Sequence, residues 1–323
     1  MFGFKPEKPV EAVRPGPVTL GFLGKLPDRA DYVHSASGSR EVQTLDASLK
    51  EWLSLQAAQQ AGDATALQTE NSNGVGFLQV GGHDRQGMSG YVFPSEDSHG
   101  RRYPFMYFSR WSDTELYFKP APLFFGSWMQ FGKTNADLAW PDQLPDLSVF
   151  DRFRNASAGA DMAAGKQLMK ASLAYLSEIS LQRWLSHLVG GDPVLQIRLL
   201  AGCRDLIDNY RSRRHRPMTD LELPLGPKDM APVSLVFWLH VLTPVGSDSL
   251  WRPDVLWSLN PAGGKMWILA RPLAGSHWQQ AIKPAPGSDW STTGQLHRHW
   301  AEQLIGQSDV RLLDVAIRWS QME

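Results

Sequence analysis

The segment at residues 88–109, M-S-G-Y-V-F-P-S-E-D-S-H-G-R-R-Y-P-F-M-Y-F-S, predicts two strands joined by a polar turn. The first strand runs through residues 91–93 to Pro94, which has no N–H to donate to a sheet ladder. The second, residues 103–108, is a nearly continuous aromatic and apolar run, typical of a strand buried on both faces. The turn carries residues that bond their own backbone or accept a positive φ, namely Ser95, Asp97, Ser98 and Gly100. Two buried strands therefore meet at a turn rich in hydroxyl, carboxylate, imidazole and guanidinium groups.

Apolar runs on both sides of this segment predict further strands of the same sheet. Residues 18–23 and 75–80 are short and apolar, and the connections between residues 75 and 109 are tight turns. Strands joined in this way pair antiparallel. The strand pattern returns in the last third of the chain, at residues 233–242, 250–259 and 265–270. The last two flank the N-P-A-G-G turn at residues 260–264.

Apolar residues at helical spacing predict helices elsewhere in the chain. One covers residues 45–61, with Thr44 placed to cap its start and Gly62 placed to end it. The aromatic segment 120–131 begins a helix under the sheet. Further helices are predicted at residues 166–188, 193–210 and 292–305. Residues 310–319 fit a helix or a strand, and their periodicity does not decide between the two.

The bulk composition limits the class of protein. The chain has 323 residues, of which 42% are hydrophobic and 20% charged, an ordinary globular composition. A net charge of −1 argues against a dedicated nucleic-acid-binding protein. Cys203 is the single cysteine, so no intrachain disulfide can form, and we expect a buried, inert thiol. The sequence has no apolar signal segment and no run of about 18 apolar residues, which predicts a cytoplasmic protein without membrane insertion.

Two motifs resemble those of the TagF (ImpM) family, accessory proteins of bacterial type VI secretion. Residues 21–33, G-F-L-G-K-L-P-D-R-A-D-Y-V, fit the family pattern G-(W/F)-x-G-K-(L/M)-P-x-x-G-D-(F/Y)-(V/I), with Ala30 where glycine is usual. Residues 94–104 fit a later pattern, P-S-x-D-x-x-G-R-x-(F/Y)-P. The candidate partner-binding or motif residues are therefore Gly24, Lys25, Pro27, Asp31, Pro94, Ser95, Asp97, Gly100, Arg101 and Pro104. Residues 221–225, 237–239 and 255–257 also look like the family's second half.

The resemblance implies an α/β/α sandwich, whereas the helical insertion and the division of the chain come from composition and periodicity, since residues 150–217 match no part of the family. We expect an α/β protein, a three-layer α/β/α sandwich around a mixed, largely antiparallel sheet, with an inserted helical hairpin. Residues 1–150 would be the N-terminal part with both motifs, 151–217 the helical insertion, and 218–323 the part that completes the sandwich. Because the composition changes at both borders of residues 166–215, we expect the sheet to fold after their removal.

The same resemblance implies a role without chemistry. The family has no known enzyme activity, so we expect neither a catalytic residue nor a cofactor. It implies a cytoplasmic negative regulator that restrains secretion after translation. Its implied partner is an Fha-domain scaffold protein, in a circuit with a Thr kinase and a phosphatase.

Catalysis at the polar turn is the alternative function. The sequence contains no H-E-x-x-H, C-x-x-C or G-x-S-x-G motif, and we expect no metal site. Ser95, Asp97 and His99 alternate along the turn, so a hydrolase or transferase could use them with Arg101. Three triad members within one short turn seldom reach the required geometry. We therefore expect Asp97 to cap the turn.

The two motif loops, residues 24–32 and 94–104, are predicted to adjoin in space because they carry opposite charges and complementary turn chemistry. In this arrangement Arg101 can hold the turn by binding a carboxylate through its planar guanidinium, with Asp31 and Asp97 as candidates, and the alternative is that it binds a carboxylate or phosphate of a partner protein.

Overall fold

The computed structural model describes residues 18–60, 74–80, 87–111, 119–146, 148–150, 165–212, 219–242, 254–260, 263–282 and 296–320. Gly62, part of the turn at 260–264 and the first residues of the helix predicted at 292–305 lie outside these ranges. Within them, no helix combines the length and the apolar character needed to cross a bilayer.

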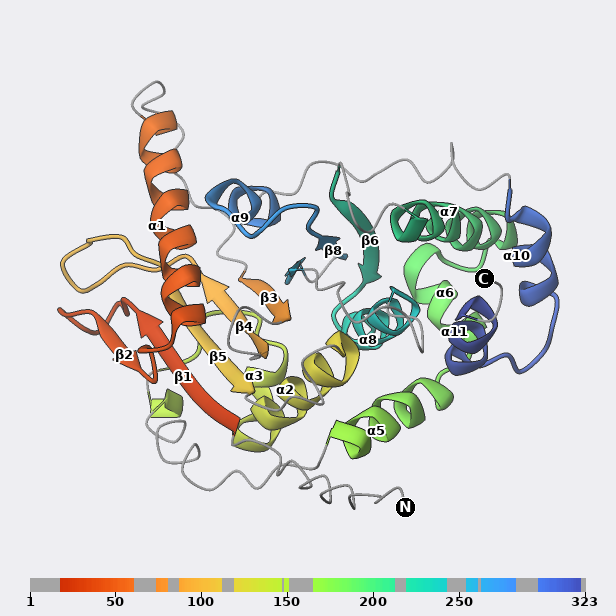
Figure 1. Ribbon diagram of the computed structural model, residues 1–323, viewed down its shortest axis with the longest axis horizontal. Helices are drawn as coiled ribbons and strands as arrows, with labels where there is room; N and C mark the ends of the chain where they lie inside the picture. Colours follow the sequence, from red (N-terminus) through yellow and green to blue (C-terminus); the bar gives the residue numbers. More distant parts are fainter. Residues whose placement is uncertain are drawn as a thin grey trace, which may run out of the picture.

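One sheet of eight strands organises the molecule (Figure 1). The strands are β1 (Val18–Gly24), β2 (Val33–Ser35), β3 (Val75–Val80), β4 (Gly87–Phe93), β5 (Phe105–Trp111), β6 (Leu221–Gly226), β7 (Val255–Ser258) and β8 (Gly264–Ile268). Their order is β2-β1-β5-β4-β3-β7-β8-β6, and every described pairing is antiparallel. The sheet that we expected to be mixed is therefore antiparallel throughout these pairings. The strands predicted between residues 18 and 109 and between 254 and 270 are confirmed, whereas residues 250–253 of the strand predicted at 250–259 lie outside the described ranges.

Helices cover both faces of the sheet and extend beyond its β6 edge (Figure 1). They are α1 (Arg40–Gln60), α2 (Pro120–Thr134), α3 (Ala136–Ala139), α5 (Gly165–Ser177), α6 (Leu181–Val189), α7 (Pro193–Ser212), α8 (Ala231–Leu242), α9 (Gly275–Ile282), α10 (Arg298–Ile305) and α11 (Leu312–Ser320). Apolar residues of α1 and α9 form one core with the first face, and α2, α3 and α8 pack on the second. This is the expected three-layer α/β/α arrangement.

The alternation of side chains explains why the deciding segment is apolar almost without interruption. On β5, Met106 and Phe108 point into the core under α1 and α9, whereas Tyr107 points into the core under α2. On β4, Val92 and Tyr91 divide in the same way. A strand with helices on both faces has no solvent side, so both sets of positions are apolar.

The helices beyond the β6 edge share their core with the sheet. Leu181, Trp184 and Leu199 belong to the same buried cluster as Leu223 of β6. The helices α5 and α7 also pack against the C-terminal helices α11 and α10. Removing residues 166–215 would therefore expose apolar core. We expected the sheet to fold without them because their composition differs from that of the rest, and the shared core contradicts that reasoning.

The structure corrects two predicted elements and decides a third that the sequence left open. Residues 233–242, interpreted as a strand, form helix α8, which is buried all round, because an apolar run of this length suits a buried helix as well as a strand. The helix predicted at 166–188 is two helices, α5 and α6, with Ser180 capping the second. Residues 310–319 mostly form helix α11.

The start of α1 is also earlier than predicted. The Ser39 hydroxyl accepts from the N–H of Val42 at 3.4 Å, so Ser39 caps the helix. Thr44, predicted as the cap, lies inside the helix and donates its hydroxyl to the carbonyl of Arg40 at 2.9 Å.

Candidate functional site

The two motif loops lie at the same end of two neighbouring strands. The first follows β1, and the second connects β4 to β5, which pairs directly with β1. Gly24 fixes this approach because a Cβ on it would lie 2.2 Å from the carbonyl oxygen of Pro104, and its φ is +130°. Only glycine accepts both this φ and this short distance. Gly24 of the first motif therefore packs directly against Pro104 of the second.

Asp97 is the centre of the contact between the loops. Its side chain is fully buried, and its Oδ2 atom accepts from Lys25 Nζ at 2.9 Å and from Arg101 Nε at 2.7 Å. Its Oδ1 atom accepts from the backbone N–H groups of His99 at 3.0 Å and Arg101 at 2.9 Å. The predicted turn cap is therefore confirmed, and the same carboxylate also binds a cation from the other loop.

These bonds decide the charge of Asp97. Burial by itself raises the pKa of a carboxyl, but the hydrogen bonds from Lys25, from Arg101 and from two backbone N–H groups outweigh it. The pKa of Asp97 is held well below its usual range, so the carboxylate is ionised at neutral pH. Its contribution to stability is present above the unfolded-state pKa and is lost as the pH falls towards the folded-state pKa.

Three backbone carbonyls of the first loop also accept bonds from the second. The Ser95 hydroxyl donates to Lys25 O at 2.7 Å, and the N–H of Ser98 donates to Arg29 O at 2.9 Å. Arg101 Nη2 donates to Ala30 O at 2.5 Å. The prediction that the loops adjoin is confirmed. Of the two carboxylates proposed for Arg101, the bonded one is Asp97, and Asp31 is an exposed residue of the first loop.

The remaining motif positions have structural explanations. Gly100 has a φ of +73° with open space around it, so glycine serves the turn and not a close approach. Ala30 stands where the family pattern has glycine, and it is not among the described residues with a positive φ, so alanine fits. Pro104 is buried where β5 begins, Pro94 is half-buried and Pro27 is exposed.

A second cluster joins the motif loops to helix α1. Tyr32 of the first loop and Tyr103 of the second stack edge to face at 5.4 Å, and both donate a hydroxyl to Asp46 Oδ1. Lys50 Nζ binds the other oxygen of Asp46 at 2.7 Å. Burial, with the nearby Asp46 carboxylate, raises the pKa of both tyrosines well above the usual value.

Sequence reasoning missed Asp46. The residue lies on a helix outside both motifs, and nothing in its neighbourhood marks it as a partner of the loops. The available signal was the pair of tyrosines, one near the end of each motif, because half-buried tyrosine hydroxyls need hydrogen-bond partners.

The side chains of the alternative catalytic set are not joined to one another as a triad. The Ser95 hydroxyl donates to a backbone carbonyl, and Asp97 binds the backbone N–H of His99 and not its imidazole. His99 Nδ1 lies 3.5 Å from the hydroxyl of Ser98. A nucleophile, a base and an orienting acid in hydrogen-bonded sequence are the geometry that acyl transfer requires. Among the described residues, no group of three or more His, Cys, Asp or Glu side chains could hold a metal ion.

The loops present an aromatic residue and charged residues of both signs to solvent. Tyr32 is 40% exposed, and the side chain of Arg101 is 60% exposed although its Nε is bonded. Arg29, Asp31 and His99 are exposed beside them. We call these five residues the motif surface. Tyrosine and arginine are the side chains that contribute most often to protein–protein binding energy.

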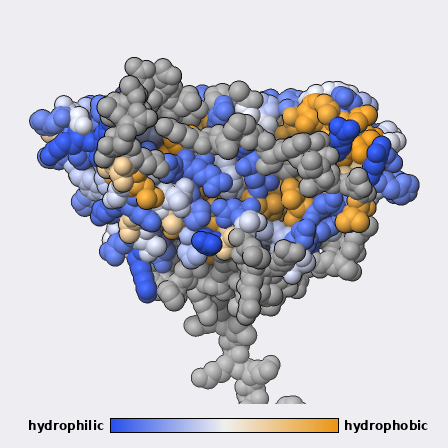
Figure 2. Space-filling model, turned by 90° about the horizontal axis from the view of Figure 1, so that it is seen from above, coloured by the Kyte–Doolittle hydropathy of each residue, from blue (hydrophilic) through white to orange (hydrophobic). Residues whose placement is uncertain are grey.

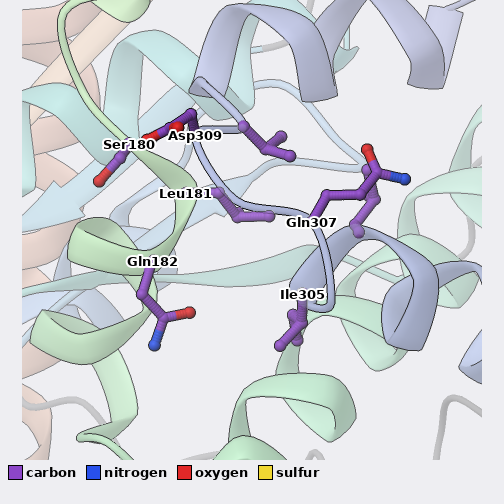
Figure 3. Close-up of a pocket in the computed structure, with 8 residues that line it drawn as sticks. Ser180, Leu181, Gln182, Ile305, Gln307 and Asp309 are labelled. Carbon is purple, nitrogen blue, oxygen red and sulfur yellow. The ribbon is translucent and has the colours of Figure 1, made fainter.

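Other surface features lie away from the motif surface. A small pocket with a volume of about 30 Å³, partly open to solvent, lies between the start of α6 and the loop that joins α10 to α11. Leu181, Gln182 and Gln307 are among the residues that line it (Figure 3). Seen from above, hydrophilic side chains dominate the end where α1 lies, and hydrophobic ones gather at the opposite end (Figure 2). The exposed large hydrophobic residues of α7 are Val194 and Leu195.

Comparison with known proteins assigns the part of the chain that carries both loops. The family model of the TagF N-terminal domain, described as type VI secretion system-associated, matches residues 21–148. Residues 21–148 are a TagF N-terminal domain. This confirms the resemblance of the two motifs. The TagF N-terminal domain contains β1 to β5, but β7 of the remaining chain pairs with its strand β3, so one sheet crosses the end of the matched span.

The crystal structure of PA0076 from Pseudomonas aeruginosa PAO1 is similar to part of the chain. The identity is 23%, and the match covers 45% of this chain and 64% of that one, with a TM-score of 0.31. The chain thus spans less than two thirds of that protein, and at this TM-score the likeness carries no argument. No curated protein matches the chain.

Proposed function

We propose that this protein is a cytoplasmic, non-catalytic negative regulator of type VI secretion that acts after translation by binding a protein partner. The TagF N-terminal domain supports the association with type VI secretion. The regulatory role and the partner, an Fha-domain scaffold in a circuit with a Thr kinase and a phosphatase, come from the motif resemblance.

The observation that carries the proposal is that the polar side chains of the turn form hydrogen bonds within the chain itself. Asp97 accepts four hydrogen bonds from its own chain, and the Ser95 hydroxyl is spent on Lys25 O. In this turn, the hydroxyl and the carboxylate that a catalytic site would need instead hold the two loops together. This arrangement supports a structural role for the turn and not a catalytic one. The exposed part of the two loops is the motif surface, whose residue types suit protein binding.

Tyr32 is the residue that we expect to anchor the partner. Its ring is held at 5.4 Å from Tyr103, and its hydroxyl is bonded to Asp46, so little side-chain entropy remains to be lost on binding. Arg29 and Arg101 lie on the same two loops and can form charge-assisted hydrogen bonds with the partner.

The test uses cells whose own copy of the gene is deleted and replaced by a tagged variant. The unchanged protein should restrain secretion and co-purify with the Fha-domain scaffold, whereas Tyr32→Ala should lose both properties. Met129→Ala is the matched control, since Met129 is also 40% exposed but lies on α2, across the sheet from α1. Full restraint of secretion by Tyr32→Ala would contradict the assignment of the surface.

A second variant separates binding from catalysis. Ser95→Ala removes one hydrogen bond between the loops and should cost about 1 kcal/mol of stability while secretion remains restrained. If Ser95 were a nucleophile, this change would abolish function in a protein that is still folded. That outcome would replace the proposal with the hydrolase or transferase alternative.

A further inference from the structure

The connection between β8 and α9 is held by side chains from distant parts of the chain. Four successive or nearby N–H groups donate to four different acceptors: Ala270 to Asp220 at 2.8 Å, Leu273 to Asp254 at 3.1 Å, Ala274 to His277 Nδ1 at 3.0 Å and Gly275 to Glu51 at 2.8 Å. Glu51 belongs to α1, so the connection is tied to the helix that carries Asp46. Figure 1 shows α9 beside α1.

The joint between α9 and α1 is tightly packed. A Cβ on Gly275 would lie 2.6 Å from the backbone nitrogen of Trp52, so the start of α9 touches the backbone of α1. Trp278, fully buried, donates its indole N–H to the Ser48 hydroxyl at 2.9 Å. A change at the first turn of α9 therefore acts directly on α1.

His277 differs from the other three acceptors because protonation turns its acceptor into a donor. It is the third residue of α9, and its imidazole reaches back to the N–H of Ala274, as a glutamate does in a capping box. Since Nδ1 accepts this bond, it carries no proton, and the ring is neutral with its proton on Nε2. A carboxylate cap keeps an acceptor oxygen after protonation, whereas Nδ1–H has none to offer.

The charged groups nearest to His277 along the described elements packed against α9 are mostly acidic, with Arg271 on the connection itself and Lys50 beside Glu51 on α1 as the basic ones. Asp220 Oδ2 lies 3.8 Å from His277 Nε2, Glu51 holds the N–H of Gly275, and Asp254 precedes β7. Strand β3 contributes no charged residue.

We infer that His277 makes the joint between α9 and α1 acid-sensitive, because a proton on Nδ1 removes the acceptor of the Ala274 N–H and loosens the first turn of α9. At neutral pH the cap is closed and α9 is fixed against α1. In acid the imidazolium keeps its neighbour Asp220 but releases the backbone. This device is separate from the motif surface and does not depend on the proposed partner.

Hydrogen exchange of residues 269–282 in the full chain tests the inference. Between pH 7.5 and pH 5.5, exchange of the Ala274 amide should accelerate by about fivefold after correction for the intrinsic pH dependence, the effect of losing one ordinary hydrogen bond. His277→Gln keeps a capping acceptor that does not titrate, so the Ala274 amide of this variant should be equally protected from exchange at pH 7.5 and at pH 5.5. In His277→Ala, which has no capping acceptor, the Ala274 amide should exchange fast at both pH values.

One neighbour titrates in the same window and needs its own control. Burial raises the pKa of Asp254 to about 6, so its protonation falls in the range of the experiment. Asp254→Asn removes that titration and should leave the pH dependence of the Ala274 amide in place. Equal protection of the unchanged protein at both pH values, or the same loss of protection in His277→Gln, would overturn the inference.

Discussion

Replacing Lys25 by methionine should destabilise the protein more than replacing Arg101 by alanine, although both residues bind the same oxygen of Asp97. The Lys25 side chain is 16% exposed, whereas that of Arg101 is 60% exposed. Breaking a buried pair costs about 3–5 kcal/mol when one charge is left alone. Because Asp97 keeps Arg101 and two backbone N–H groups, we expect Lys25→Met to cost about 2 kcal/mol.

The cost for Arg101→Ala is smaller because water already screens its ion pair, and exposed pairs are worth about 1 kcal/mol or less. The change also removes the bond to Ala30 O, so the total expected loss is about 1 kcal/mol. Thermal melting should show both losses as shifts of roughly 1–2 °C for each kcal/mol, given an unfolding entropy of about 2.1 cal/mol/K for each of the 323 residues. The double variant should lose more than the sum of the two, because Asp97 is then a buried carboxylate without a cation.

Equal shifts for Lys25→Met and Arg101→Ala, or a larger one for Arg101→Ala, would refute this reasoning. The result would mean that exposure does not decide the strength of the two contacts. An additive double variant would show that the two cations do not share one carboxylate in solution.

Two further changes test other parts of the structure. Gly24→Ala should cost about 3 kcal/mol because of the positive φ and the contact with Pro104, whereas Gly100→Ala, at a positive φ in open space, should cost about 1 kcal/mol; urea unfolding of the pair checks the ranking. Burial lowers the pKa of His240 to about 4, so unfolded chains bind more protons between pH 6.5 and 4, and stability should fall across this window by at most about 3 kcal/mol. His240→Gln, which keeps a partner for Ser172, should flatten this part of the pH profile, and an unchanged profile would contradict it.

The sheet and the adjacency of the two motif loops could be predicted because their signals are local. Tight turns between apolar runs give antiparallel neighbours, and strands β1 and β5 place their loops at the same end. Gly24 and Asp97 are motif residues whose roles follow from backbone geometry and from turn chemistry, which the sequence carries.

The remaining features depend on tertiary contacts that no local pattern reports. Asp46 binds both tyrosines only because α1 lies over the end of β1 and β5. The apolar run of α8 fits a buried strand as well as a buried helix. It forms a helix because it packs between the sheet and other helices, which bury it on all sides. The helices beyond β6 look separate in composition, yet Trp184 lies in the same core as the sheet.

Binding of the purified Fha-domain scaffold by the full chain tests the central claim most directly. Titration should give a dissociation constant that Met129→Ala leaves unchanged and that Tyr32→Ala weakens at least about tenfold, as for an interface residue that carries more than 1 kcal/mol. Met129→Ala should melt close to the unchanged protein, and Tyr32→Ala should melt slightly lower, because it loses the bond to Asp46 and the contact with Tyr103, but should be fully folded at the temperature of the titration. No binding by the unchanged protein, or equal binding by Tyr32→Ala, would contradict the account of the motif surface as the partner site.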